Sequence, residues 1–136
     1  MERAIVTSRL ALRMPSEPAT AQDVPIAQDL LDTLAAHANE CVGLAANMVG
    51  IRKRIIAVDD NGTPRAMLNP EIVEKNNPYE TEEGCLSLPG RRATTRYQDI
   101  VVRWQDLAMT WHVQRFSGWT AQIIQHEIDH CDGILI

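Results

Sequence analysis

The sequence has no long apolar run. Its longest uncharged stretch, from Cys41 to Ile51, is too short to cross a bilayer. The first residues contain no apolar block typical of a signal peptide, and Arg9 and Arg13 interrupt the segments that follow. We therefore expect a cytoplasmic protein without membrane association, which begins with an ordinary strand and loop.

Positive charge and cysteine are also scarce. The chain has 13 Lys and Arg against 18 Asp and Glu, for a net charge of −5. No basic stripe could neutralise phosphates, so we expect no nucleic-acid partner. Cys41, Cys85 and Cys131 are odd in number and far apart. This spacing excludes a disulfide framework and indicates a reducing compartment, with thiols that are reactive or bind metal.

The length and composition that remain are those of an ordinary globular protein. The chain has 136 residues, of which 45% are hydrophobic and 23% charged. It contains neither an internal repeat nor a low-complexity segment. We expect a single domain over residues 1–136, and nothing in the composition indicates an oligomeric state.

Hydrophobic periodicity and turn residues predict two helices with strands between them. The first helix runs from about Val24 to Ala38, with Asp23 as its cap and Pro25 in its first turn. The second runs from about Trp119 to Cys131, and Gly133 is its expected stop. The expected strands and turns are a buried strand at 54–59, a turn at 60–62, one or two short strands at 67–73 interrupted at Pro70, and a hairpin of 97–104 with 107–116 around 105–106.

This order of elements predicts the fold class. A helix, several strands and a final helix are typical of an α+β fold with a mostly antiparallel sheet.

The final helix carries a metal-binding pattern. Residues 126–130 read His-Glu-Ile-Asp-His, which fits H-E-x-x-H. On a helix, His126 and His130 lie one turn apart on the same face, so both imidazoles can bind one ion while Glu127 stands beside it as a base. The alternative is a pair of helical histidines without metal, and the predicted amphipathic helix favours the metal site.

A catalytic site of this kind normally needs a third protein ligand. A pattern with a third histidine six residues after His130 would place it at position 136, which is Ile136. The third ligand is therefore expected upstream, and the candidates are Cys41, Cys85, His37 and His112. Cys85 is favoured because glycine and proline flank its segment, although a small buried hydrophobe is its alternative role. For His112 we expect a solvent-facing strand position, and for His37 a structural role near a helix end.

Three sequence blocks occur in a fixed order: Gly43-Leu44-Ala45-Ala46, then Glu83-Gly84-Cys85-Leu86-Ser87, then Gln125-His126-Glu127-Ile128-Asp129-His130. Together they resemble the peptide deformylase family over nearly the whole chain. The resemblance implies a compact α+β fold in which the H-E-x-x-H helix packs among antiparallel strands. It also implies a hydrolase that removes the formyl group from N-formylmethionine at the start of a new polypeptide.

The resemblance also implies roles for individual residues. Cys85, His126 and His130 would bind one divalent ion, Fe²⁺ or Zn²⁺. Glu127 would take a proton from water and return it to the departing amine. The backbone N–H of Leu86 would donate to the developing oxyanion. The residues expected to contact the N-formylated peptide are Val42, Gly43, Met48, Gly84, Arg92 and Gln122.

The sequence departs from the family pattern in its first block. The family reads G-x-G-L-A-A-x-Q, whereas this chain has Cys41 at the first glycine and Met48 at the glutamine. In the family that glutamine donates a hydrogen bond to the oxyanion, and a thioether has no donor. Loss of one such donor typically costs roughly 2.7–4 kcal/mol, or about 10²–10³ in turnover. We therefore expect reduced activity.

Gln122 is a second departure, because the family usually has an apolar residue or an arginine there. It lies one turn before His126, where it could alter the side-chain pocket, reach toward the place of the missing donor, or face solvent. Gln125 and Asp129 are expected to support the site without reacting. Two other functions stay open. One is hydrolysis of a different N-acyl amino acid or peptide, and the other is peptide binding without catalysis, against which the intact Glu127 argues.

Overall fold

A computed structural model describes residues 1–136. Five strands form one sheet in the order β1-β2-β3-β4-β5, and each pairs antiparallel with the next. The strands are β1 (Gly43–Ala45), β2 (Ile55–Asp60), β3 (Thr63–Gly84), β4 (Arg91–Gln105) and β5 (Trp111–Ser117). The helices are α1 (Arg9–Leu12), α2 (Val24–Ala36) and α3 (Gly118–Cys131), with short 3₁₀ turns η1 (Ala21–Asp23) and η2 (Ala46–Val49). The predicted α+β class is confirmed.

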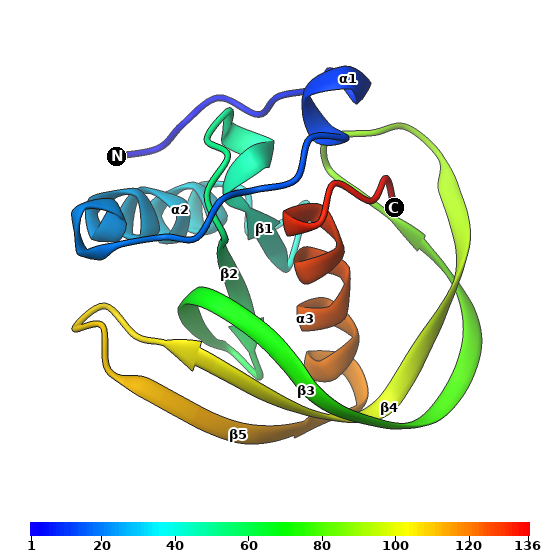
Figure 1. The fold of residues 1–136 in the computed structure, drawn as a ribbon. Helices are drawn as coiled ribbons and strands as arrows, with labels where there is room; N and C mark the ends of the chain where they lie inside the picture. The colour runs from blue at the N-terminus through cyan, green and yellow to red at the C-terminus, as the bar shows by residue number, and fades with distance from the viewer.

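The sheet curls around α3, which lies inside the curve of the long β3–β4 hairpin (Figure 1). The helix packs against β1, β2 and β4, while α2 packs against β1, β2 and β3. A single cluster of 27 buried apolar residues joins these layers. Burial on this scale, at about 25 cal/mol per Å² of apolar surface, is the main force that holds α3 against the sheet. The H-E-x-x-H segment therefore sits on a rigid, buried element.

The predicted first helix is confirmed as α2, but its capping differs from the prediction. Asp23 occupies the N-cap position without bonding to the first turn. Its Oδ2 instead accepts a hydrogen bond of 2.8 Å from the Thr20 N–H, which caps the preceding turn η1. Pro25 lies in the first helical turn, where its missing N–H leaves no helical bond unmade.

The strand expected at 67–73 is much longer than predicted. As β3 it begins at Thr63 and continues through Pro70 to Gly84. The register shifts between Leu68 and Glu71, so Pro70 lies in a bulge where its missing N–H interrupts no ladder bond. Beyond the bulge the strand is polar and largely exposed, so it lacks the apolar alternation that marks a strand in the sequence.

The hairpin near the end of the chain forms with different limits. Strand β4 begins at Arg91 rather than at 97, and β5 begins at Trp111 rather than at 107. The connection covers 106–110, where the Asp106 Oδ1 accepts hydrogen bonds from the N–H groups of Ala108 and Thr110. A strand expected at the N-terminus is absent, and the short helix α1 is the first regular element. That expectation was wrong.

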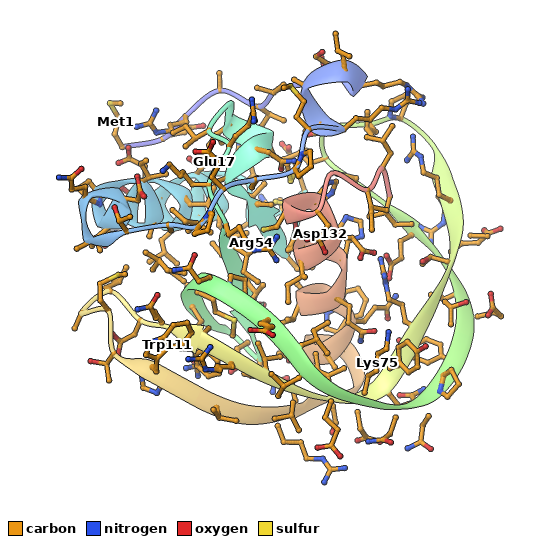
Figure 2. All side chains as sticks on the ribbon, viewed as in Figure 1. Met1, Glu17, Arg54, Lys75, Trp111 and Asp132 are labelled. Carbon is orange, nitrogen blue, oxygen red and sulfur yellow. The ribbon has the colours of Figure 1, made fainter.

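The end of α3 is tied to the start of β2. Arg54 donates from Nη1 to Asp132 Oδ1 over 2.7 Å, and both residues are labelled in Figure 2. Gly133 then adopts a φ of +76°, a conformation that glycine tolerates, and ends the helix as predicted. None of the helices has the length and apolar character needed to cross a membrane.

Candidate active site

Three potential metal ligands converge beside α3. Cys85 follows β3 directly, in the loop at the tip of the β3–β4 hairpin, and His126 and His130 lie one turn apart on α3. The Cys85 Sγ is 3.3 Å from His130 Nε2, which is 3.2 Å from His126 Nε2. All three donor atoms lie within 4.8 Å of one another. The other candidates, Cys41, His37 and His112, are not part of this cluster.

The His126 ring is oriented by a carboxylate. Its Nδ1 donates to Glu83 Oε1 over 2.8 Å, which leaves Nε2 facing the cluster. Burial lowers the pKa of His126, but the Glu127 charge and the bonds to Cys85 and Glu83 raise it to about 10. Burial, followed by the charge on His126, lowers the pKa of His130 to about 3. His130 is therefore a neutral imidazole, the form that binds a metal.

Glu83 is itself held by a buried arginine. Arg96 on β4 donates from Nη2 to Glu83 Oε1 over 2.7 Å and from Nε to Oε2 over 3.0 Å. A further bond runs from Arg96 Nη1 to Asp129 Oδ2 on α3, over 2.7 Å. Burial would raise the pKa of Glu83, but the bonds from His126, Arg96 and Gln122 lower it to about 2. The carboxylate is therefore a permanent anion behind the histidine.

Glu127 lies beside the cluster and is only 4% exposed. Its Oε1 is buried without a hydrogen-bond partner. Burial raises the pKa of this carboxyl to about 7, the range in which a group can both accept and return a proton. A buried oxygen without a partner is costly, so Glu127 is placed to meet a group that arrives from the cavity.

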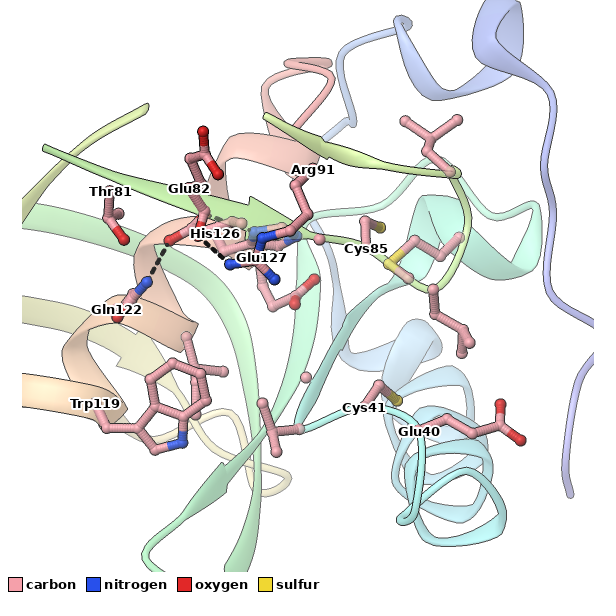
Figure 3. Close-up of a pocket in the computed structure, with 18 of the residues that line it drawn as sticks. Glu40, Cys41, Thr81, Glu82, Cys85, Arg91, Trp119, Gln122, His126 and Glu127 are labelled. Atoms are coloured by element: carbon pink, nitrogen blue, oxygen red, sulfur yellow. Dashed lines mark hydrogen bonds and ion pairs between the residues drawn. The ribbon is translucent and has the colours of Figure 1, made fainter. Parts of the chain in front are cut away.

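Cys85, His126 and Glu127 face one cavity of about 870 Å³ (Figure 3). It lies between α3, the start of β1 and the end of β3, and the figure shows Trp119 and Gln122 on the α3 side and Cys41 and Glu40 opposite. Burial raises the pKa of the Cys41 thiol to about 11, so that thiol stays neutral. The cavity is large enough for a short peptide segment.

Gly43 is required by the close approach of β1 to α3. A Cβ at this position would lie 2.8 Å from Glu127 Oε2 and 2.8 Å from Ile123 Cγ2. We expect Gly43→Ala to displace the Glu127 carboxylate and to lower turnover at least about tenfold, since misplaced catalytic groups lose rate steeply. Steady-state assays of the purified variant measure this loss.

Gly62→Ala is the control for Gly43→Ala. Gly62 has a φ of +93° in the β2–β3 turn, with nothing within 4 Å of its Cβ position. An alanine there is strained by roughly 1–2 kcal/mol, so it should lower Tm without changing turnover. Equal losses of turnover in the two variants would contradict the role given to Gly43.

The donor set suits a divalent ion. One cysteine and two histidines are ligands that Zn²⁺ and Fe²⁺ accept, and three protein ligands leave a position open for water. His126 has the carboxylate partner that ligating histidines usually have, and Glu127, with one oxygen unpartnered, lines the same cavity as Cys85 and His126. The residues present therefore fit a catalytic metal.

Comparison with known proteins identifies the group to which this arrangement belongs. The sequence pattern of the family described as "Polypeptide deformylase" matches residues 3–136. The chain is 49% identical to a peptide deformylase of Clostridium beijerinckii over 136 residues, which cover all of both chains. The chain belongs to the peptide deformylase family. The resemblance seen in the sequence is confirmed.

Solved peptide deformylases share the fold closely. The enzyme from Thermotoga maritima has a TM-score of 0.89 and 31% identity, over 99% of this chain and 95% of that one. A class I type b peptide deformylase from Acinetobacter baumannii, solved with Met-Ala-Ser bound, has a TM-score of 0.88 and 29% identity, over 99% and 97%. Deformylases are metal-dependent hydrolases, and this chain carries a Cys/His group able to hold a metal.

Most of the residues predicted for substrate contact line the cavity of this deformylase. They are Val42, Gly43, Met48, Gly84 and Gln122. Leu86, expected to donate to the oxyanion, lines the cavity as well. Arg92 does not line it, because its Nη2 turns back to the Pro89 carbonyl over 3.1 Å. Arg91, which the sequence reasoning passed over, lines the cavity instead and donates to the Glu82 carbonyl over 2.7 Å.

Met48 fills its position without supplying a donor. It is 1% exposed and lies on the 3₁₀ turn η2, just after β1. Its Sδ accepts from the Ala45 N–H at 3.4 Å. The thioether therefore takes up a backbone donor and offers none to the cavity.

The supporting pair Glu83–Arg96 was missed by sequence reasoning. Glu83 was visible in the second block, but no spacing pointed to Arg96, because its partner lies 13 residues away on the opposite strand. Gln125, expected to support the site, bonds instead to the backbone N and O of Tyr97, at 2.8 Å each. Asp129 supports it indirectly through Arg96.

Proposed function

We propose that this chain hydrolyses the formyl group from N-formylmethionyl peptides, including the N-terminus of a nascent polypeptide, with a turnover reduced by Met48. Residues 1–136 act as one unit in this proposal. The observation that carries it is the buried, unpartnered Glu127 carboxylate beside the Cys85, His126 and His130 donors, in the wall of a peptide-sized cavity.

Cys85, His126 and His130 would hold one divalent ion. This donor set suits Fe²⁺ and Zn²⁺ alike, so availability selects between them. When bound, the ion supplies a water of lowered pKa and polarises the formyl oxygen. Because the pKa of His126 is raised to about 10, its imidazole would lose one proton when the ion binds. Glu83 keeps the proton on Nδ1, so Nε2 is the nitrogen that would lose its proton and offer a lone pair to the ion.

The chain's own residues move the proton and steady the charge. Glu127 accepts a proton from the attacking water and returns it to the departing amine. Leu86 lines the cavity, where its N–H would donate to the developing oxyanion. Met48 adds no second donor, which is the reason for the reduced turnover.

The peptide would lie across the cavity between β1 and the Cys85 loop. Val42 and Gly43 on one side and Gly84 on the other present backbone that can flank an extended peptide. Trp119 and Gln122 form the wall next to its first side chain. The charged contact expected of Arg92 is assigned to Arg91, which lines the cavity.

Metal analysis joined to an assay under anaerobic conditions tests the proposal. The purified protein should contain about one Fe²⁺ or Zn²⁺ per chain and should hydrolyse N-formyl-Met-Ala-Ser. Treatment with a chelator should remove metal and activity together, and added Fe²⁺ or Zn²⁺ should restore both. Cys85→Ala should abolish metal retention, whereas Cys131→Ala, its counterpart outside the cluster, should leave it unchanged.

A panel of N-acyl peptides separates the remaining functions. If N-acetyl or longer N-acyl analogues of Met-Ala-Ser were hydrolysed faster than the formyl peptide, the protein would be a different amidohydrolase. If the metal-loaded protein bound formyl peptide but hydrolysed none of the panel, the peptide-binding alternative would replace catalysis.

A further inference from the structure

The side-chain amide of Gln122 does not face solvent, and it does not point to the place of the oxyanion donor that is missing at Met48. Gln122 lies on α3 one turn before His126, and its Nε2 donates to Glu83 Oε2 over 2.9 Å. Figure 3 shows the side chain reaching from the helix, above Trp119, to this bond. The bond joins the helix to the end of strand β3, immediately before the Cys85 loop.

The two oxygens of Glu83 accept hydrogen bonds from different side chains of α3, and both also accept from Arg96. Oε1 accepts from His126 Nδ1 over 2.8 Å and from Arg96 Nη2 over 2.7 Å. Oε2 accepts from Gln122 and from Arg96 Nε over 3.0 Å. The plane of the carboxylate is thus fixed from two directions, by Arg96 on β4 and by Gln122 on α3.

The two contacts from α3 form a clamp. Gln122 and His126 are four residues apart, so their side chains share one face of the helix. One carboxylate accepts from both, through different oxygens. Rotation of the Glu83 carboxylate about the Cγ–Cδ bond would move Oε1 away from the His126 imidazole. The same rotation would break the contact between Oε2 and Gln122. Arg96 also connects this carboxylate to α3, but only indirectly, through its bond to Asp129, whereas Gln122 contacts the carboxylate from the helix directly.

We propose that Gln122 is a positioning residue for the metal centre. Its amide holds Glu83, Glu83 holds the His126 ring, and Nε2 of that ring stays aimed at the space shared with Cys85 and His130. The inference rests on the proposed function, in which these three residues are the metal ligands. In this proposal Gln122 supports the metal ligand His126 through Glu83 and also lines the cavity in which the peptide would lie.

Two methionine substitutions on α3 test the role. Gln122→Met keeps an unbranched side chain and removes the donor to Glu83. Gln125→Met removes the same amide three residues later, where its partners are the Tyr97 backbone groups. Both proteins are loaded with Co²⁺, and two quantities are measured: the visible absorption bands of Co²⁺ and the rate at which a chelator removes it.

Gln122→Met should alter the Co²⁺ bands and speed the removal of Co²⁺ by about tenfold, the lower end of the effect for direct partners of a ligand. Gln125→Met should lower Tm while leaving the bands and the removal rate unchanged. Gln122→Asn, which is too short to reach Glu83, should reproduce the effect of Gln122→Met and serves if the methionine variant does not fold.

The outcomes separate this inference from the proposed function. If the unmodified protein binds Co²⁺ and Gln122→Met leaves its bands and removal rate unchanged, the positioning role is wrong while the metal site stands. Equal changes in the Gln122 and Gln125 variants would mean general loosening of α3, which also overturns the role. An unmodified protein that binds no Co²⁺ would overturn the metal site itself, and this inference with it.

Discussion

Glu127→Gln is expected to lower turnover on N-formyl-Met-Ala-Ser by about 10²–10⁴-fold, the usual contribution of a general acid–base group. Glutamine has the same shape and fills the same buried space, but it cannot accept and return a proton. Glu127 is not one of the three clustered donors, so metal content should stay at the unmodified level. The measurement is kcat and bound metal on the same preparation.

Asp132→Asn is the matched control for Glu127→Gln. It removes one carboxylate directly after the same helix, where Asp132 pairs with Arg54 and neither residue lines the cavity. This exposed pair contributes little, roughly 0–1 kcal/mol, so the control should retain both metal and turnover. Turnover in Glu127→Gln within about tenfold of the unmodified enzyme would remove Glu127 as the proton carrier.

Met48→Gln is expected to raise turnover by up to about 10²–10³-fold, the amount that one oxyanion donor is worth. Methionine and glutamine are similar in length and both unbranched, so the exchange should fit the buried site. The Ala45 N–H, which now donates to the sulfur at 3.4 Å, would donate to the new amide oxygen. That bond would turn the amide nitrogen toward the cavity that Met48 lines.

The gain should come from the donor rather than from repacking. Met48→Leu changes shape to a similar degree without adding a donor, so its turnover should stay at or below that of the unmodified enzyme. A rise confined to kcat, with KM nearly constant, is the signature of a contact made mainly in the transition state. If Met48→Gln folded, bound metal and showed no gain, the loss of the family glutamine would not be what limits this enzyme.

The sequence predicted the elements whose pattern is apolar and periodic. Helix α2 buries one face in the core, and α3 and the first four residues of β2 are buried almost throughout, so burial imposes the apolar pattern that the sequence displays. The outer half of β3 buries almost nothing and is held by its ladder to β4, which leaves no apolar pattern to read. Its extent could therefore not be predicted from residue types.

The residues of the site also fall into those that the sequence could predict and those that it could not. His126 and His130 were predictable because one helix sets their spacing, and Cys85 was favoured by its glycine- and proline-flanked loop. Arg96 and the choice of Arg91 over Arg92 depend on how two strands align and which face each residue takes. A one-residue change of register reverses that face, and composition carries no record of it.

The bonds from Arg96 to Glu83 and Asp129 bear on the order in which this protein folds and binds metal. They already fasten the hairpin tip to α3 through side chains alone, with the three donor atoms gathered close together. The chain entropy of assembling the ligands is thus lost during folding and not on metal uptake. We therefore expect metal binding to follow folding in this chain, in contrast to a zinc finger, in which the ion drives folding.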